Sequence, residues 1–233
     1  MSAWTYPSGR SLRRWTCCDR LSRRPADTDG LQMRAGPGRL MLAIDRDDYW
    51  QVAYVIAKGS IEQIRATGLD ALRRSVAGVA PDLAGRVSEI GAWDDVKMLT
   101  VRIDRLRRWY APGVLLIGDA AHAMSPIGGV GINLAVQDAV AAARILAGPL
   151  LAGELATSDL AKVRSRRAFP TIGTQLLQRA AQRFVVARVL AARGPVTAPA
   201  PLRLLRRLPT PQRVPARIIG VGLRPEHLQP YPK

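Results

Sequence analysis

Cysteine is scarce in this sequence, since the 233 residues contain only Cys17 and Cys18, which are adjacent. Adjacent cysteines rarely pair and do not make a disulfide framework, so a disulfide-stapled secreted fold is excluded. Their scarcity indicates a reducing compartment and leaves no cluster of ligands for a metal site. Aromatic residues are also few, at 5%, which is a poor supply for stacking on nucleic-acid bases.

Long apolar runs and acidic residues are scarce as well. No uninterrupted apolar run approaches the roughly 20 residues that a membrane-spanning helix needs, and the first 18 residues lack the apolar core of a secretory signal. We therefore expect a cytoplasmic protein without a membrane span.

The formal net charge is +17, from 35 Lys and Arg against 18 Asp and Glu. This charge leaves open a basic nucleic-acid-binding protein. The arginines are scattered, however, and no recognition helix, zinc finger or RNA-binding platform occurs, so we expect no nucleic-acid partner.

The most informative stretch runs from residue 113 to residue 139. Its apolar run at 114–117 predicts a strand buried on both faces. Gly118 and Asp119 end that strand, which places a carboxylate where open α/β sheets bind ligands, and its acceptor oxygens suit a sugar or ribityl hydroxyl. A glycine-rich loop then leads into an Ala-rich helix at 133–146, which we expect to be buried and to offer unpaired N–H groups in its first turn.

A family resemblance rests on this stretch. Residues 118–122 read Gly-Asp-Ala-Ala-His, and the run resembles the second flavin motif of the FAD-dependent aromatic hydroxylases, the single-component flavoprotein monooxygenases. In that family the aspartate binds the ribityl chain of FAD, the proline lies beside the reactive edge of the isoalloxazine, and the glycine loop and helix start face its pyrimidine side. The resemblance implies that FAD is bound by Asp119, Pro126, Gly128, Gly129, Gly131, Ile132 and Asn133.

His122 has two interpretations. It is either a catalytic base or a structural histidine beside the loop. Because no nucleophile or orienting partner is evident near it in the sequence, we favour the structural role and assign no catalytic residue.

A hairpin is predicted upstream, with strands at 39–44 and 50–57 around a polar turn at 46–48. Trp50 and Tyr54 share one face of the second strand and Gln51 lies on the other. One face would pack on helices and the other would line a pocket. The resemblance implies that this sheet covers an aromatic substrate, so Trp50, Gln51 and Tyr54 are candidates for the substrate wall. Ordinary core packing explains each of them equally well.

Two further helices are expected at 160–169 and 171–192, with Pro170 interrupting them. An apolar stripe on the second helix, which we expect to pack in the core, consists of Leu176, Ala180, Phe184, Ala187 and Ala191. The resemblance implies that the C-terminal helices either pack on the flavin domain or serve a homodimer, and both options stay open.

The predicted fold class is α/β, as an α+β fragment. It comprises the C-terminal part of a FAD-binding Rossmann-like domain, a β-sheet substrate domain and C-terminal helices. We divide the chain into an unassigned segment at 1–35, the substrate-domain sheet and helices at 36–110, the FAD-binding strand, loop and helix at 111–150, and a C-terminal helical region at 151–233. Our hypothesis is that residues 1–18 are not family sequence, which a late start codon or a shifted reading frame would explain.

The motif Gly-x-Gly-x-x-Gly is missing from the sequence. Family members open with this motif, which holds the ADP pyrophosphate at a helix N-terminus. We therefore expect a truncated form that lacks the ADP-binding half. This form should bind FAD weakly or not at all. The activity that the resemblance implies is hydroxylation of a small aromatic substrate by an oxidoreductase that uses FAD and takes electrons from NAD(P)H. A non-catalytic remnant is the alternative, and NADPH oxidation with added FAD would separate the two.

Overall fold

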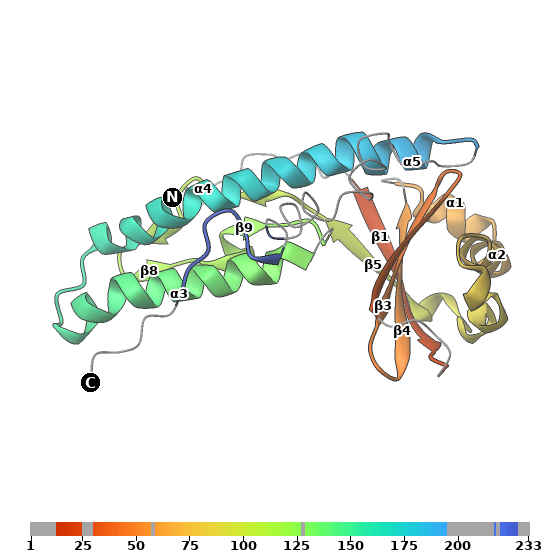
Figure 1. Ribbon diagram of the computed structural model, residues 1–233, viewed down its shortest axis with the longest axis horizontal. Helices are drawn as coiled ribbons and strands as arrows, with labels where there is room; N and C mark the ends of the chain where they lie inside the picture. The colour runs from red at the N-terminus through yellow and green to blue at the C-terminus, as the bar shows by residue number, and fades with distance from the viewer. Residues whose placement is uncertain are drawn as a thin grey trace. The chain divides into compact units, whose positions relative to one another are not determined.

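The computed structural model describes residues 13–24, 30–56, 59–126, 129–194, 217 and 220–227 (Figure 1). Within it the chain forms two compact units. We call residues 11–101 and 181–197 the sheet unit, and residues 1–10, 102–180 and 198–233 the loop–helix unit. The division by function at residues 36, 111 and 151 stays a prediction.

The sheet unit is built on one antiparallel sheet of five strands in the order β2-β3-β4-β1-β5. The predicted hairpin is confirmed as β3 and β4, which pair from Leu40 opposite Val55 to Asp45 opposite Trp50. Asp47, at a positive φ of 68°, forms the turn between them. The strands are β1 (Arg13–Ser22), β2 (Leu31–Gly36), β3 (Arg39–Asp45), β4 (Tyr49–Ile56) and β5 (Val96–Val101).

Strand β1 is an interior strand of this sheet, next to the edge strand β5, although the sequence predicted no element before residue 36. It pairs with β4 on one edge and with β5 on the other. Its backbone N–H and C=O groups can therefore be satisfied on both sides, and this pairing does not depend on an alternating apolar pattern. That is why inspection of the side-chain pattern missed β1. Strand β2, at the edge of the sheet, pairs with β3 and has no buried residue among its six.

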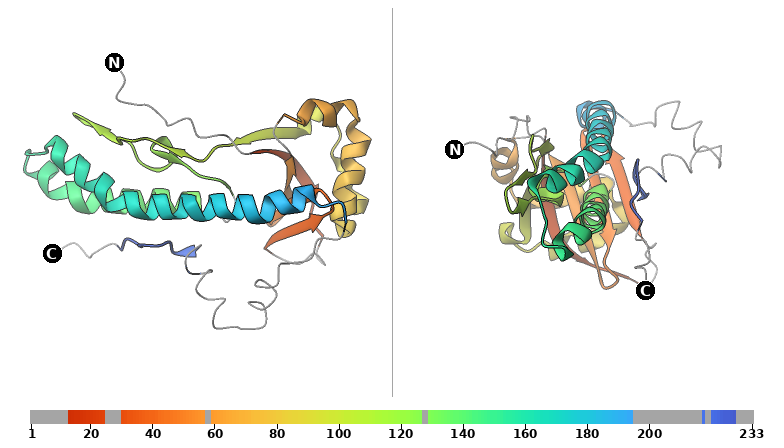
Figure 2. Two further views of the ribbon diagram at one scale, coloured as in Figure 1. Left: turned by 90° about the horizontal axis from the view of Figure 1, so that it is seen from above. Right: turned by 90° about the vertical axis from the view of Figure 1, so that its left-hand side faces the viewer.

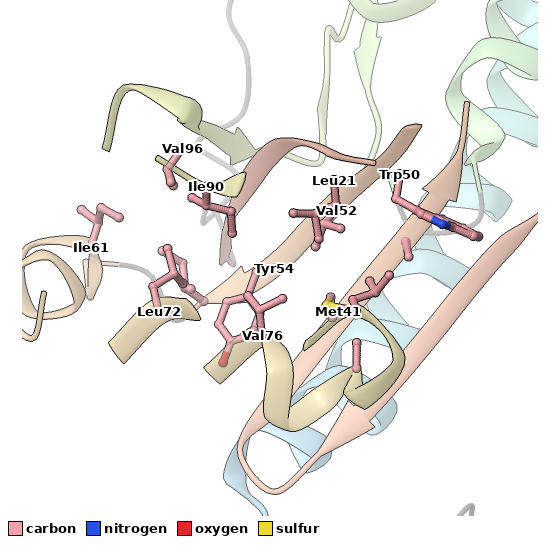
Figure 3. Close-up of a cluster of buried hydrophobic side chains, with 14 residues drawn as sticks. Leu21, Met41, Trp50, Val52, Tyr54, Ile61, Leu72, Val76, Ile90 and Val96 are labelled. Carbon is pink, nitrogen blue, oxygen red and sulfur yellow. The ribbon is translucent and has the colours of Figure 1, made fainter. Parts of the chain in front are cut away.

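The core of the sheet unit lies between the sheet and its helices (Figure 3). Trp50 and Tyr54 of β4 belong to this core together with Leu72 and Val76 of α2, and all four are at most 7% exposed. The Tyr54 hydroxyl and Ser75 Oγ are 2.7 Å apart, so this buried hydroxyl has a partner. Burying each such apolar side chain contributes about 1.5–3 kcal/mol. The helices are α1 (Ile61–Ala66), α2 (Leu69–Val79), the 3-10 helices η1 (Pro81–Glu89) and η2 (Trp93–Asp95), the π-helix η5 (Gln182–Val186) and α5 (Ala187–Ala191).

Among its described residues, the loop–helix unit has two long helices and four very short strands. Figure 2 shows the long helices running alongside each other. The strands form two antiparallel pairs, β6 with β9 and β7 with β8. The elements are β6 (Asp104–Arg105), β7 (Tyr110–Ala111), β8 (Val114–Leu115), the 3-10 turn η3 (Gly118–Ala120), β9 (His122–Ala123), α3 (Val130–Leu151) and α4 (Thr157–Ala181).

The prediction of a buried strand at 114–117 is wrong. Strand β8 spans only Val114–Leu115, and Val114 is 47% exposed. A strand is buried on both faces when neighbouring strands and helices cover it. Among the described residues, β8 pairs only with β7.

Helix α3 is longer and more exposed than we expected. It begins at Val130 and continues through Gly148 and Pro149 to Leu151. One stripe is buried, at Val130, Leu134, Asp138, Ala141 and Leu146, whereas Ile132 is 73% and Val136 57% exposed. The expectation of a fully buried helix is therefore wrong, because an apolar composition by itself does not show what covers each face.

By length and composition alone, α3 is also long and apolar enough to cross a membrane, a test that core helices of soluble proteins pass too. The sequence analysis counted uninterrupted apolar runs and expected no span. A location in the cytoplasm stays a prediction.

Helix α4 runs without a break through Pro170, which is buried inside it, so the predicted interruption is wrong. The predicted core stripe is wrong as well, since Leu176 is 58% and Phe184 66% exposed. The buried face of α4 is instead largely polar and includes Arg167, Gln175 and Gln178. These side chains satisfy buried backbone and carboxylate groups, and this polar pairing decides which face of the helix points inward.

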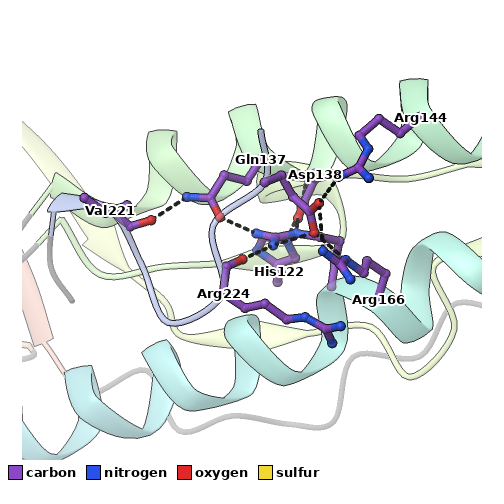
Figure 4. Close-up of polar contacts among 10 residues, drawn as sticks. His122, Gln137, Asp138, Arg144, Arg166, Val221 and Arg224 are labelled. Carbon is purple, nitrogen blue, oxygen red and sulfur yellow. Dashed lines mark hydrogen bonds and ion pairs between the residues drawn. The ribbon is translucent and has the colours of Figure 1, made fainter. Parts of the chain in front are cut away.

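The C-terminal segment at 220–227 lies against α3 and α4 (Figure 4). The Gln137 side chain donates to the Val221 carbonyl over 2.8 Å. The Glu226 carboxylate, with a side chain only 1% exposed, bridges the two helices. It accepts from Arg166 Nε at 2.6 Å and lies 3.2 Å from Arg144 and 3.6 Å from Arg167.

Glu226 makes the stability of the chain depend on pH. Burial would raise the pKa of this carboxyl group, but the hydrogen bond from Arg166 and the charges of Arg166, Arg167 and Arg144 outweigh it, so the pKa lies below its ordinary value of 4.5. A lowered pKa stabilises the fold above the unfolded-state pKa, and the contribution is lost as the pH falls through the folded-state pKa.

We expect Glu226→Gln to lower the urea midpoint at pH 7. We also expect the variant to have a flatter fall of this midpoint below pH 4.5, because the wild type loses the Glu226 contribution as the pH falls towards the lowered folded-state pKa. Urea unfolding between pH 7 and pH 3 measures both effects. Glu154→Gln is the control, because Glu154 is exposed. Parallel profiles for wild type and Glu226→Gln would contradict this prediction.

Candidate functional site

The turn η3 presents Asp119 to solvent. Gly118 has a φ of +57°, in the left-handed region that glycine adopts at little cost. Asp119 follows it and is exposed, and no described residue forms a hydrogen bond or ion pair with its carboxylate. The acceptor oxygens of Asp119 are thus available to a ligand.

The glycine-rich bend leads into α3. The Gly129 N–H donates to the Pro126 carbonyl over 3.0 Å, and Gly129, with a φ of +64°, is the N-cap of α3. Pro126, Gly129 and Ile132 are exposed, whereas Gly131 and Asn133 are half-buried. Gly128 lies outside the described residues. The first turn of α3 has N–H groups without partners in the helix, at the positive end of its dipole.

Packing brings the turn and the helix start together. A Cβ built on Gly118 would lie 3.0 Å from the Ala135 Cβ of α3, and a Cβ on Gly131 would lie 3.5 Å from the Met124 Cβ. The Asp119 turn therefore lies directly against the first turns of α3. Their closeness along the sequence suggested that the Asp119 turn and the start of α3 lie together, but only the packing shows this contact.

Two polar side chains hold the loop around this site. Gln178 of α4 accepts from the Ser125 N–H at 3.0 Å and donates to the Ser125 carbonyl at 2.8 Å, just before Pro126. The side-chain amide of Asn133 donates to the Gly220 carbonyl over 3.0 Å, so it is engaged by the C-terminal segment.

Beneath the turn lies Asp138, which the sequence analysis did not select. Its fully buried carboxylate accepts hydrogen bonds from Gly118 N at 3.1 Å and Arg167 Nε at 2.8 Å, and lies 2.6 Å from His122 Nε2 (Figure 4). Burial would raise the pKa of Asp138, but the hydrogen bond with His122, the His122 and Arg167 interactions and the Gly118 N–H together lower it. One feature of the sequence could have singled out Asp138: it and Arg144 are the only charged residues of α3.

His122 is 1% exposed, and its ring lies 4.9 Å from the Trp109 ring. Asp138 is the orienting partner that the sequence did not reveal. Because the ring is enclosed by the protein, this environment fits the structural role better than that of a base for a ligand. One cavity of about 500 Å³ lies nearby, lined by Leu106, Trp109 and Ile172 together with arginines, and no candidate flavin residue lines it.

The three candidates for the substrate wall separate in the structure. Trp50 and Tyr54 belong to the core of the sheet unit, against the helices. Gln51 is half-buried on the opposite face, where its Oε1 accepts from Arg46 at 2.8 Å. Contact of any of the three with a substrate stays a prediction.

A family model described as "FAD binding domain" matches residues 23–180. This chain belongs to the FAD binding domain family. The match covers the hairpin, the Asp119 turn, the glycine bend and both long helices, so the predicted family is confirmed.

Relatives in the FAD binding domain family are named as monooxygenases. The chain is 34% identical over 135 residues to 6-methylpretetramide 4-monooxygenase of Streptomyces rimosus, covering 58% of this chain and 32% of the relative. It is 30% identical over 105 residues to protoasukamycin 4-monooxygenase of Streptomyces nodosus subsp. asukaensis, covering 44% and 26%. The matches thus span about a third or less of these two relatives.

Solved structures show the same fold. OxyS anhydrotetracycline hydroxylase from Streptomyces rimosus aligns with a TM-score of 0.60 at 22% identity, over 98% of this chain and 44% of the hydroxylase. The predicted fold class, a mixed helix and sheet fragment of this FAD-dependent monooxygenase fold, is therefore confirmed.

Proposed function

We propose that this chain provides the part of an FAD-dependent monooxygenase site that holds the ribityl chain and the isoalloxazine ring. The observation that carries this proposal is the exposed Asp119 carboxylate, without a partner among the described residues, on a turn packed against the start of α3. Membership of the FAD binding domain family supports FAD as the ligand.

Each residue has a distinct part in this proposal. Asp119 accepts hydrogen bonds from ribityl hydroxyls, as an acceptor-only group can. The N–H groups of Gly131, Ile132 and Asn133 lie in the first turn of α3, where the helix dipole stabilises negative charge on the ring. Pro126 and Gly129 form the bend against which the flat ring rests. Because Gly129 has nothing within 4 Å of a built Cβ, the ring can approach its backbone closely.

Bound FAD supplies the redox chemistry, with NAD(P)H as the electron donor and an aromatic ring as the acceptor of oxygen. The residues of the chain bind and orient the flavin and exclude water from it. In this proposal no side chain of the chain has to move a proton. Contact with the aromatic substrate stays a prediction, for which Trp50, Gln51 and Tyr54 are the candidates.

We expect the chain to bind riboflavin and FAD with similar, weak affinities, within about threefold of each other, because every proposed contact reaches the ring or the ribityl chain. Asp119→Asn should weaken both about tenfold or more, since hydrogen bonds to a charged group contribute about 1.5–3 kcal/mol. Quenching of flavin fluorescence, with the shift in the flavin absorbance spectrum, measures these affinities.

The control is Asp94→Asn, which changes another exposed carboxylate on a 3-10 turn, in η2. It should leave flavin affinity unchanged. Equal affinities for wild type and Asp119→Asn, or no binding of riboflavin by the wild type, would contradict the proposed function.

A further inference from the structure

The carboxylate of Asp138 makes a backbone contact that bears directly on Asp119. Its Oδ2 accepts from the N–H of Gly118, the residue immediately before Asp119, over 3.1 Å. Asp138 is fully buried, on the helix whose first turn faces the proposed flavin ring. One side chain of α3 is thus tied to the backbone that carries Asp119.

The tied backbone has an uncommon conformation. Gly118 has a φ of +57°, and a Cβ at this position would lie 3.0 Å from Ala135. The turn can therefore lie this close to α3 because residue 118 has no side chain, and in this conformation the Gly118 N–H reaches the Asp138 carboxylate. Displacement of the carboxylate would release the turn from the helix.

Asp138 is itself held from two further elements. His122 of β9 lies 2.6 Å from Oδ2, and Arg167 of α4 donates to Oδ1 over 2.8 Å. Arg167 also donates to Gln137 Oε1 at 3.2 Å and to the Arg224 carbonyl at 3.1 Å. The Arg167 charge balances that of Asp138, and Glu226 lies 3.6 Å from Arg167. The carboxylate therefore has one defined position.

We propose that Asp138 is a positioning residue for flavin binding: through the Gly118 N–H it holds the turn that carries Asp119 against the first turns of α3. His122 and Arg167 fix the carboxylate and do not touch the flavin. The inference rests on the proposed function, which assigns Asp119 to the ribityl chain. It adds that a buried residue with no ligand contact determines flavin affinity.

The test is Asp138→Asn, a nearly isosteric change that leaves one acceptor oxygen for three donors. We expect the Gly118 amide to exchange its hydrogen about tenfold faster or more in the full chain without flavin. We also expect Kd for riboflavin and for FAD to rise about tenfold. Hydrogen exchange read by NMR and fluorescence titration with each flavin measure the two effects.

The matched control is Asp159→Asn. Asp159 is also buried, accepts a backbone N–H, from Ala156 at 3.0 Å, and pairs with a cation, Lys162 at 2.7 Å, but it does not contact the Gly118 turn. A general loss of stability should appear in both variants. Faster exchange at Gly118 together with weaker flavin binding should appear only in Asp138→Asn.

The exchange measurement separates this inference from the proposed function. If Asp138→Asn and Asp159→Asn have the same hydrogen-exchange protection at Gly118 and the same flavin Kd, the inference is overturned. If Gly118 loses protection while Asp119→Asn has no effect on Kd, the proposed function fails, and with it the role of Asp138 in flavin binding. Should Asp138→Asn not fold, Asp138→Glu keeps the charge for Arg167 and moves the carboxylate relative to Gly118. Unchanged exchange and Kd in that variant would overturn the inference.

Discussion

Replacing Arg167 with methionine is expected to lower the free energy of unfolding by about 3–5 kcal/mol, because it leaves a buried carboxylate without its charged partner. Arg167 is fully buried, and its Nε donates to Asp138 over 2.8 Å. The same guanidinium donates to the Arg224 carbonyl, so the variant also weakens the attachment of the C-terminal segment. Urea denaturation followed by circular dichroism measures the change.

Arg164→Met is the control for this prediction. Arg164 lies one turn earlier on α4, is half-buried, and makes no hydrogen bond or ion pair with the described residues. Its replacement should change stability by no more than about 0.5 kcal/mol. If Arg167→Met unfolds at the same urea concentration as Arg164→Met, the Asp138–Arg167 pair does not have the energetic role that we assign to it.

Gly118→Ala is expected to lower the free energy of unfolding by about 2–5 kcal/mol and to weaken flavin binding. Two costs add up. A left-handed alanine costs about 1–2 kcal/mol, and forcing a methyl group to 3.0 Å from Ala135 costs about 1–3 kcal/mol more. Thermal and urea unfolding measure the sum, and riboflavin titration measures the effect on the neighbouring Asp119.

Gly113→Ala separates these two costs. Gly113 has a φ of +75°, but a Cβ there would have no heavy atom within 4 Å. It should therefore show only the conformational cost. Equal destabilisation by the two variants would mean that the turn moves away from α3 to accommodate the methyl group. In that case flavin binding should fall more than stability does.

Short sequence patterns predicted those parts of the fold that depend on residues close together along the chain. The polar turn between two apolar runs predicted β3 and β4, which pair as the expected hairpin. The spacing from Gly118 to Asn133 predicted the family, which the match over residues 23–180 confirms. In each case the information lies within a few residues or within one motif.

The burial of the long helices could not be predicted in this way. The apolar stripe with Leu176 and Phe184 suggested a core face, yet the buried face of α4 carries Arg167 and Gln178. A hydrophobic pattern predicts burial only when the partner surface is apolar. Here that surface consists of the Ser125 backbone and the Asp138 carboxylate, whose unmet hydrogen bonds would cost more than an exposed leucine.

The sequence by itself determined the family, the hairpin and the identity of the exposed acid, because each depends on residues close together along the chain. The tertiary structure alone decided that Asp138 meets Gly118, His122 and Arg167, which are 16 to 29 residues away from it. Such contacts form where separate elements pack, and a buried charge selects its partner by distance in space, since an unpaired charge in the interior is costly.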